Sequence, residues 1–257
     1  MTAARLRRSL VVPSVAALAA LAALIWLGTW QLERKAWKED LIAALTQRLA
    51  AAPDNLPAPA AWDRLTQKAD EFRRVAFAAE FLHDREALVY TAGSGLRGDV
   101  SGPGYWVFTP ARRLDGSLVM INRGFVPDGR QNPGSRAAGQ TPGTAQIVGA
   151  LRWPEARGLF TPADNPERNL WFVRDHLAIA AAKGVGPVAP FFIDQEAPVP
   201  DGGLPRPGKL TPNLPNNHLQ YALTWYGLAL VLAVLFLIWV LSPTYRARRE
   251  AGTPEQM

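Results

Sequence analysis

Two long apolar segments, one near each end, are the features that most constrain how this chain can fold. No charged residue occurs between Arg8 and Glu33 or between His218 and Arg246. About 20 apolar helical residues cross a bilayer core of roughly 30 Å, and both segments reach that length. A buried helix of a soluble protein rarely stays apolar on every face for so long. The sequence therefore predicts membrane-spanning helices at residues 10–30 and 218–241.

The basic residues beside these segments predict their orientation. Three arginines precede the first segment and three follow the second, namely Arg5, Arg7, Arg8, Arg246, Arg248 and Arg249. Positive residues next to membrane helices tend to stay cytoplasmic. We therefore expect cytoplasmic tails at residues 1–9 and 242–257 and a large domain at residues 31–217 on the other side, which in a bacterium is the periplasm.

The net charge of +6 does not indicate a nucleic-acid partner. Six of the 28 Lys and Arg and two of the 22 acids lie in the tails, so the segment between the helices is near +2. The chain has no Cys, which excludes disulfides, thiolate chemistry and Cys-based metal sites.

A cleaved signal peptide is the alternative for the first segment. Its small-residue matches fall inside the apolar run, and the run ends at Trp26 to Trp30 without a small-residue cleavage site. These two Trp are typical of interfacial anchors. We therefore favour an uncleaved membrane anchor.

The helical spacing of apolar residues continues past the first segment. Trp37, Leu41 and Leu45 repeat at helical intervals, which predicts a helix over residues 31–50. Three prolines then interrupt residues 51–61, a segment that we interpret as a linker.

Short strand-like segments occupy residues 72–195. Two of them flank Leu114-Asp115-Gly116, a strong hairpin signal. Closely spaced strands with few crossover helices favour a mainly antiparallel domain, either barrel-like or sandwich-like. The expected fold class is an α+β membrane protein in which two transmembrane helices flank this external β domain.

Signals for an enzyme are weak. Residues 93–98 have the spacing G-x-G-x-x-G, but the chain continues into another strand and not into the helix that would receive a pyrophosphate. No G-x-S-x-G motif occurs, and no two of the three His are four residues apart. The sequence therefore predicts no enzyme.

His218 stands at the outer edge of the second membrane segment. Ionisable residues at membrane depth are costly and are often functional. Its imidazole could ligate a haem iron, and a neighbouring Asn or Gln could orient the other ring nitrogen. The alternative is an interfacial His that caps the helix and contacts lipid headgroups.

Four sequence blocks occur in an order that spans nearly the whole chain. They are LGTWQLERKAWK at residues 27–38, GYWVFTP at 104–110, INRGFVP at 121–127 and NNHLQYALTW at 216–225, with a looser block at 164–172. This pattern resembles the Surfeit-locus family of cytochrome c oxidase assembly proteins. The first and last blocks are the most specific.

The resemblance implies a function that the composition does not. Such proteins help to mature subunit I of haem-copper oxidases, and some bacterial members are thought to bind haem a through the His that opens the second helix, here His218. The expected function is therefore assistance of haem a insertion into subunit I. Subunit I, the lipid bilayer and haem a synthase are the expected partners, without nucleic acid. A scaffold that binds no haem and a periplasmic membrane-anchored enzyme are the alternatives.

The remaining site residues follow from this hypothesis. Two Trp could stack on the macrocycle, although an aromatic belt at the membrane surface is the alternative reading of them. Gln31, Arg34 or Arg123 could bind the propionates, with which arginine pairs well, although a structural ion pair is the alternative for each Arg. The expected site comprises His218 as axial ligand with Trp30, Gln31, Arg34, Arg123, Tyr221 and Trp225. Short tails with Arg-rich ends favour a bacterial inner membrane.

Overall fold

The computed structural model describes residues 3–94, 96–211 and 215–242. Most of the expected C-terminal tail, the first two residues of the N-terminal tail and Gly95 of the expected loop lie outside the described residues. The chain forms two compact units, and each is described by itself. The helical unit comprises Met1–Leu41 and Pro215–Met257, and the β unit comprises Ile42–Leu214.

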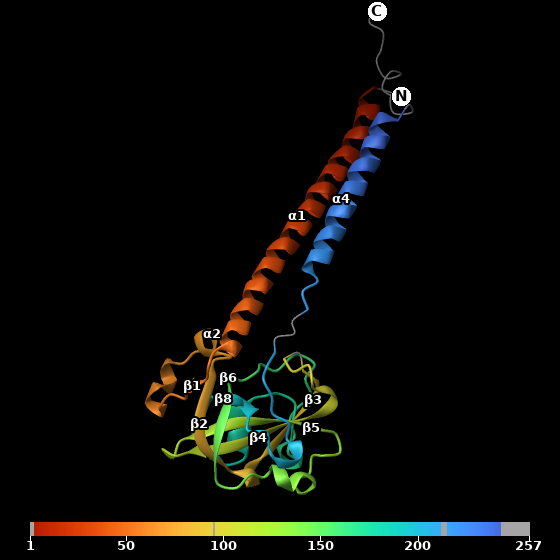
Figure 1. Cartoon of the computed structure of the whole chain (residues 1–257). Helices are drawn as coiled ribbons and strands as arrows, with labels where there is room; N and C mark the ends of the chain where they lie inside the picture. Colours follow the sequence, from red (N-terminus) through yellow and green to blue (C-terminus); the bar gives the residue numbers. More distant parts are fainter. Residues whose placement is uncertain (1–2, 95, 212–214, 243–257) are drawn as a thin grey trace, which may run out of the picture. The chain divides into compact units, whose positions relative to one another are not determined.

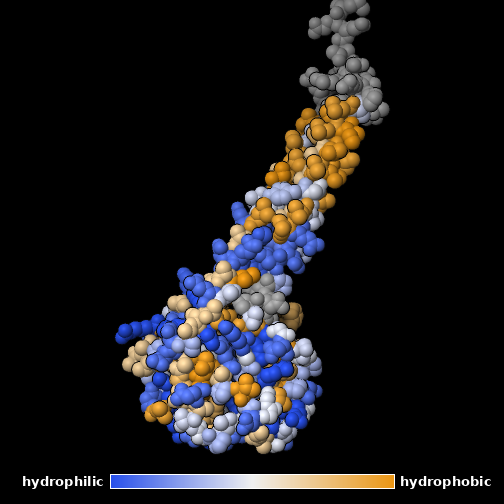
Figure 2. Space-filling view, in the orientation of Figure 1, coloured by the Kyte–Doolittle hydropathy of each residue, from blue (hydrophilic) through white to orange (hydrophobic). Residues whose placement is uncertain are grey.

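The helical unit contains two long helices that run side by side in opposite directions (Figure 1). They are α1, Ala3–Ala50, and α4, His218–Leu241. Both are long and apolar enough to cross a membrane, and Figure 2 shows an apolar surface over much of their length. α1 passes without interruption from the apolar segment into the amphipathic segment expected after it. These helices confirm the membrane-protein part of the expected fold class.

Small residues allow α1 and α4 to approach closely. A Cβ atom on Gly28 would lie 2.7 Å from Cε1 of Tyr226, so the ring occupies the space that a side chain would need. The Oγ1 of Thr29 and the Tyr226 hydroxyl form a hydrogen bond of 3.1 Å. Ala222 and Ala229 are also buried. Small residues at helix contacts are a common basis of association in membranes, where lipid competes equally for apolar surface.

The β unit is built around a closed barrel. β2, β6, β8, β5 and β4 pair in that order, and a pairing of β2 with β4 closes the ring. All of these pairings are antiparallel except β5 with β8. The strands are β1 Asp54–Asn55, β2 Arg74–Phe81, β3 Ala87–Gly93, β4 Ser101–Arg113, β5 Leu118–Pro127, β6 Thr144–Arg152, β7 Leu170–Trp171 and β8 Val188–Ala197. The mainly antiparallel, barrel-like expectation is confirmed.

The expected hairpin joins β4 and β5. Gly116 adopts φ +82°, which a residue without Cβ reaches without strain. The Asp115 carboxylate accepts the backbone N–H of Ser117 at 3.0 Å and fixes the turn. The loop between β3 and β4 contains the G-x-G-x-x-G spacing, as expected for a connection between strands.

Two apolar clusters form on the two faces of the barrel strands. One includes Val75, Ile121, Ile147 and Phe191. The other lies under the short helix α3, His176–Ala182, and includes Phe192 and other aromatic residues. A four-residue helix, α2, Gln67–Asp70, precedes β2. Side chains alternate between the faces of each strand, so the two clusters follow from the pleat.

The segment expected as a linker is packed onto the barrel. α1 ends at Ala50, before the prolines, and the chain then forms β1 and a 3-10 helix, Pro59–Arg64. Trp62 of that helix meets Phe191 of β8 edge-on at 5.6 Å between ring centroids. Such aromatic contacts are favourable beyond the area they bury. Leu56, within residues 51–61, is almost fully buried in the first apolar cluster, so this proline-rich segment contributes to the core.

Candidate functional site

The candidate site lies in the helical unit, where His218 opens α4. Its Nδ1 lies 2.7 Å from the Oε1 of Gln31 on α1. An amide oxygen can only accept a hydrogen bond, so Nδ1 carries the proton. With the proton on Nδ1, a neutral imidazole has its free lone pair on Nε2. No hydrogen bond involves Nε2 within the described part of the chain.

This arrangement fits a histidine that ligates a metal. Ligating His residues usually donate their second ring N–H to a neighbouring acceptor, which fixes the tautomer and the orientation of the ring. The sequence assigned Gln31 to propionate binding and expected an Asn or Gln near His218 to orient the ring. The structure places Gln31 itself against His218, across the helix pair. This contact could not be predicted from the sequence, because Gln31 and His218 are far apart in the chain and come together only when the two helices pair.

Two buried polar atoms near His218 in the sequence have no hydrogen-bond partner among the described residues. They are the Oδ1 of Asn216 and the Nε1 of Trp225. An unpaired buried polar group costs about 1–3 kcal/mol, so each could gain from a ligand or a water. Trp225 was an expected site residue, whereas Asn216 was missed. The polar Asn-Asn pair before the apolar segment was the signal that could have identified it.

The other expected residues of the helical unit are exposed. The guanidinium of Arg34 lies 5.9 Å from the ring centroid of Trp30 and 5.0 Å from that of Trp37. Trp30 is 40% exposed and Tyr221 is 55% exposed. Cation–π contacts with two indole rings position the guanidinium. It forms no ion pair among the described residues. Its hydrogen-bond donors therefore remain free to bind an anion.

Arg123 belongs to the β unit and not to the helical unit. It is 2% exposed, donates to the backbone oxygen of Gly139 and lies against the ring of Phe81. Burial lowers the pKa of Arg123 to about 10, although the nearby Glu86 opposes that shift. These contacts hold the loop that follows β5.

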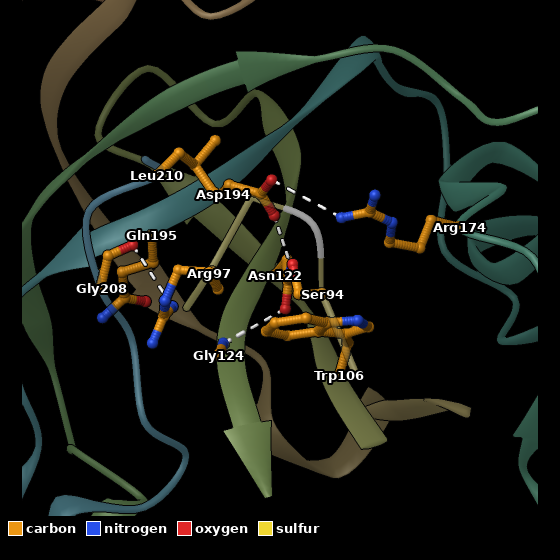
Figure 3. Close-up of a pocket in the computed structure, with 10 residues that line it drawn as sticks. All are labelled: Ser94, Arg97, Trp106, Asn122, Gly124, Arg174, Asp194, Gln195, Gly208 and Leu210. Atoms are coloured by element: carbon orange, nitrogen blue, oxygen red, sulfur yellow. Dashed lines mark hydrogen bonds and ion pairs between the residues drawn. The ribbon is translucent and has the colours of Figure 1, made fainter. Parts of the chain in front are cut away.

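A second polar cluster lies inside the β unit (Figure 3). The carboxylate of Asp194 accepts hydrogen bonds from Asn122 at 2.6 Å and from Arg152 at 3.0 Å, and it lies 3.7 Å from Arg174. The cavity beside it has a volume of only about 10 Å³. That is at most the space of a single water. The cluster therefore satisfies buried charges and leaves no room for a substrate.

Comparison with known proteins assigns the family. The model of the SURF1 family matches residues 18–230. The SURF1-like protein of Monosiga brevicollis is 38% identical over 226 residues, which cover 83% of this chain and 81% of that protein. Surfeit locus protein 1 of Homo sapiens is 38% identical over 223 residues, covering 82% of this chain and 71% of the relative. The protein of the same name from Rattus norvegicus is 37% identical over 220 residues, covering 82% and 70%. The chain therefore belongs to the SURF1 family, and this membership supports the role in cytochrome c oxidase assembly that the sequence resemblance implied.

Proposed function

We propose that this protein assists the insertion of haem a into subunit I of a cytochrome c oxidase, and that it holds haem a at the outer membrane face through His218. The observation that carries the proposal is the hydrogen bond from His218 Nδ1 to Gln31 Oε1, which leaves Nε2 with a free lone pair. Haem supplies an iron with axial positions that accept an imidazole nitrogen.

Residues of both helices would hold the group. Gln31 orients the imidazole, and Arg34 has free donors for a propionate. Trp30, Tyr221 and Trp225 provide aromatic surface beside these polar groups. Arg123 is not part of this proposal, because its donors serve the interior of the β unit.

The setting of the site is also a proposal. We place the two helices in a bacterial inner membrane, with both termini cytoplasmic and the β unit periplasmic, because arginines flank the apolar segments. Subunit I is the recipient, and haem a synthase is the second expected partner. A site at the membrane surface suits a porphyrin that has a lipid-soluble tail.

The deciding experiment is an optical spectrum of the detergent-purified protein, produced together with haem a synthesis. We expect a haem a spectrum in the parent and its loss in His218→Ala. Gln220→Ala is the matched control, because Gln220 is an exposed polar residue in the same first turn of α4. A colourless parent, or a spectrum unchanged in His218→Ala, would refute ligation by His218.

A scaffold that binds partly built subunit I without haem is the second candidate. The family assignment supports assembly and does not require haem. Two results together would favour this scaffold. The parent protein would be colourless, and oxidase subunits would co-purify with His218→Ala at the same level as with the parent.

A further inference from the structure

A groove of about 580 Å³ crosses the surface of the β unit, and its lining residues are different from those of the proposed function. It lies between the start of β3, the loop after β5 and the end of α3. We call it the amide groove and define it by Glu86, Leu88, Pro133, Gln140, Asn169 and Lys183. Its volume is within the range of ligand-binding clefts, about 300–1,000 Å³.

A buried ion pair supports the groove. The carboxylate of Glu86 receives two hydrogen bonds from Arg136, and both side chains are almost fully buried. Arg136 also donates to the backbone oxygens of Arg130 and Gln131 in the loop after β5. The Nδ2 of Asn169 donates to the backbone oxygen of Glu86 at 3.1 Å. These contacts fix the walls of the groove relative to one another.

Within the part of the chain that the structure describes, three buried polar atoms of groove residues have no hydrogen-bond partner. They are the Nε2 and Oε1 of Gln140 and the Oδ1 of Asn169. Most buried polar side-chain atoms in proteins have a hydrogen-bond partner. The Gln140 amide, in which neither the nitrogen nor the oxygen is paired, therefore requires an explanation. A rotation of the Gln140 side chain into the groove would let a ligand pair with both ends.

Lys183 is a cation that lines the groove, and the two carboxylates that also line it, those of Asp84 and Glu86, are paired with Arg85 and Arg136. It is partly buried, and it takes part in no ion pair among the described residues. Burial lowers the pKa of Lys183, the nearby Glu86 opposes this shift, and Arg85 adds to it. The carboxylate of Glu86 is already bound by Arg136. A partly desolvated ammonium without a counter-charge favours an anionic ligand.

We propose that the amide groove binds an extended peptide segment of a partner protein that carries a carboxylate. A side-chain amide offers N–H donors and a C=O acceptor, which match the C=O and N–H that one residue of an extended peptide presents on the same side. In this complex Gln140 pairs with the C=O and N–H of one peptide residue, and Asn169 Oδ1 accepts a further N–H. Lys183 binds the carboxylate, and Leu88 and Pro133 contact an apolar side chain. The site is independent of haem binding at His218.

The test uses the full-length protein in detergent and three dye-labelled tetra-alanine peptides, with binding followed by fluorescence anisotropy. One peptide has a free C-terminal carboxylate, one is amidated with an aspartate in the third position, and one is amidated and neutral. We expect at least one acidic peptide to bind roughly tenfold or more tightly than the neutral one, as for a charged hydrogen bond. The preferred acidic peptide identifies whether a terminal or a side-chain carboxylate is the source.

Two variants and a control decide whether the amide groove is the site. Lys183→Met should weaken binding of the acidic peptide roughly tenfold. Lys209→Met removes an equal charge from an exposed position of the same unit and should leave binding unchanged. Gln140→Leu should weaken binding yet raise the melting temperature of the free protein, because it removes an unpaired buried amide. If Gln140 had only a structural role, its replacement would not both weaken peptide binding and raise the melting temperature.

Three results would overturn the proposal. They are failure of both acidic peptides to bind, equal binding of the neutral peptide, and equal loss of binding in Lys183→Met and Lys209→Met. None of them bears on haem binding by His218, which the optical spectrum tests separately.

Discussion

Gln31 and His218 stand 187 positions apart in the sequence, and a hydrogen bond of 2.7 Å joins Oε1 of the first to Nδ1 of the second. The bond links the N-terminal end of α4 to α1, at the level where the apolar segment of α1 is followed by charged residues. The bond therefore connects the two helices and also fixes the tautomer of the proposed haem ligand.

Replacement of Gln31 should therefore weaken haem binding without removing the ligand. Gln31→Leu leaves His218 Nδ1 without its acceptor, and loss of such a partner typically costs about 10–100-fold in metal affinity. Gln31→Glu keeps an acceptor and should retain binding. Spectroscopic haem titration of both variants measures the effect. Equal affinity of Gln31→Leu and the parent would mean that Gln31 does not orient the imidazole.

The close approach of α1 and α4 depends on Gly28. Gly28→Leu places atoms in the ring of Tyr226, and overpacking of this kind costs about 1–3 kcal/mol. We expect a lower melting temperature in detergent and weaker haem binding, since Gln31 and His218 are then forced apart. Gly227→Leu is the control, because a Cβ there meets nothing within 4 Å. Similar melting temperatures for the two variants would contradict the packing at Gly28.

Removal of one partner from the buried pair of Glu86 and Arg136 should be strongly destabilising. Arg136→Ala leaves the Glu86 carboxylate buried without its partner, a change that typically costs about 3–5 kcal/mol. The double variant Glu86→Leu, Arg136→Met removes both charges, so its free energy of unfolding should fall by less than that of Arg136→Ala. Asp84→Ala breaks an exposed ion pair with Arg85 and should cost at most about 1 kcal/mol. Denaturant unfolding followed by Trp fluorescence gives the three values, and equal losses for Arg136→Ala and Asp84→Ala would contradict the prediction.

His176 should make the stability of the β unit depend on pH. The ring is fully buried, and burial lowers the pKa of His176 below its usual 6.5, although the hydrogen bond to the backbone oxygen of Ala189 opposes the shift. Below pH 6.5 the unfolded chain takes up a proton that the folded one does not. Stability is thus complete above pH 6.5 and falls as the pH drops toward the lowered pKa, by at most about 1.4 kcal/mol per pH unit.

Melting temperatures of the parent and of His176→Leu between pH 7.5 and 5 test this dependence. The variant loses the hydrogen bond to Ala189, but its melting temperature should fall less with acidification. Burial also lowers the pKa of His83, so a smaller slope of the same sign should remain. Parallel curves for the two proteins would exclude His176 as the source.

The absence of Cys permits a clean test of membrane orientation. A single Cys in place of Leu114, which is 80% exposed at the β4–β5 turn, should react with a membrane-impermeant reagent in intact spheroplasts. A Cys in place of Thr253 should react only after lysis if both termini are cytoplasmic. The reverse pattern would invert the proposed topology.

Much of the fold could be predicted because its signals are local. Uncharged length predicted both membrane helices, and strand-turn spacing around Asp115 predicted the β4–β5 hairpin. The proline-rich segment after Ala50 was interpreted as a linker, because its packing is tertiary. Leu56 of this segment is buried in the core of the β unit, and no periodicity in the segment predicts that burial.

The site divides in the same way. The sequence alone determined that an ionisable His218 begins an apolar helix, and that no Cys or closely spaced His pair offers another metal ligand. Which residue contacts its imidazole depends on the tertiary structure, which places Gln31 of the sequence-distant first helix there. Only the tertiary structure, likewise, enclosed Arg123 within the β unit and left the Gln140 amide unpaired beside Lys183. Length and polarity are properties of neighbouring residues, whereas hydrogen-bond partners and burial depend on which distant segments the folded chain brings together.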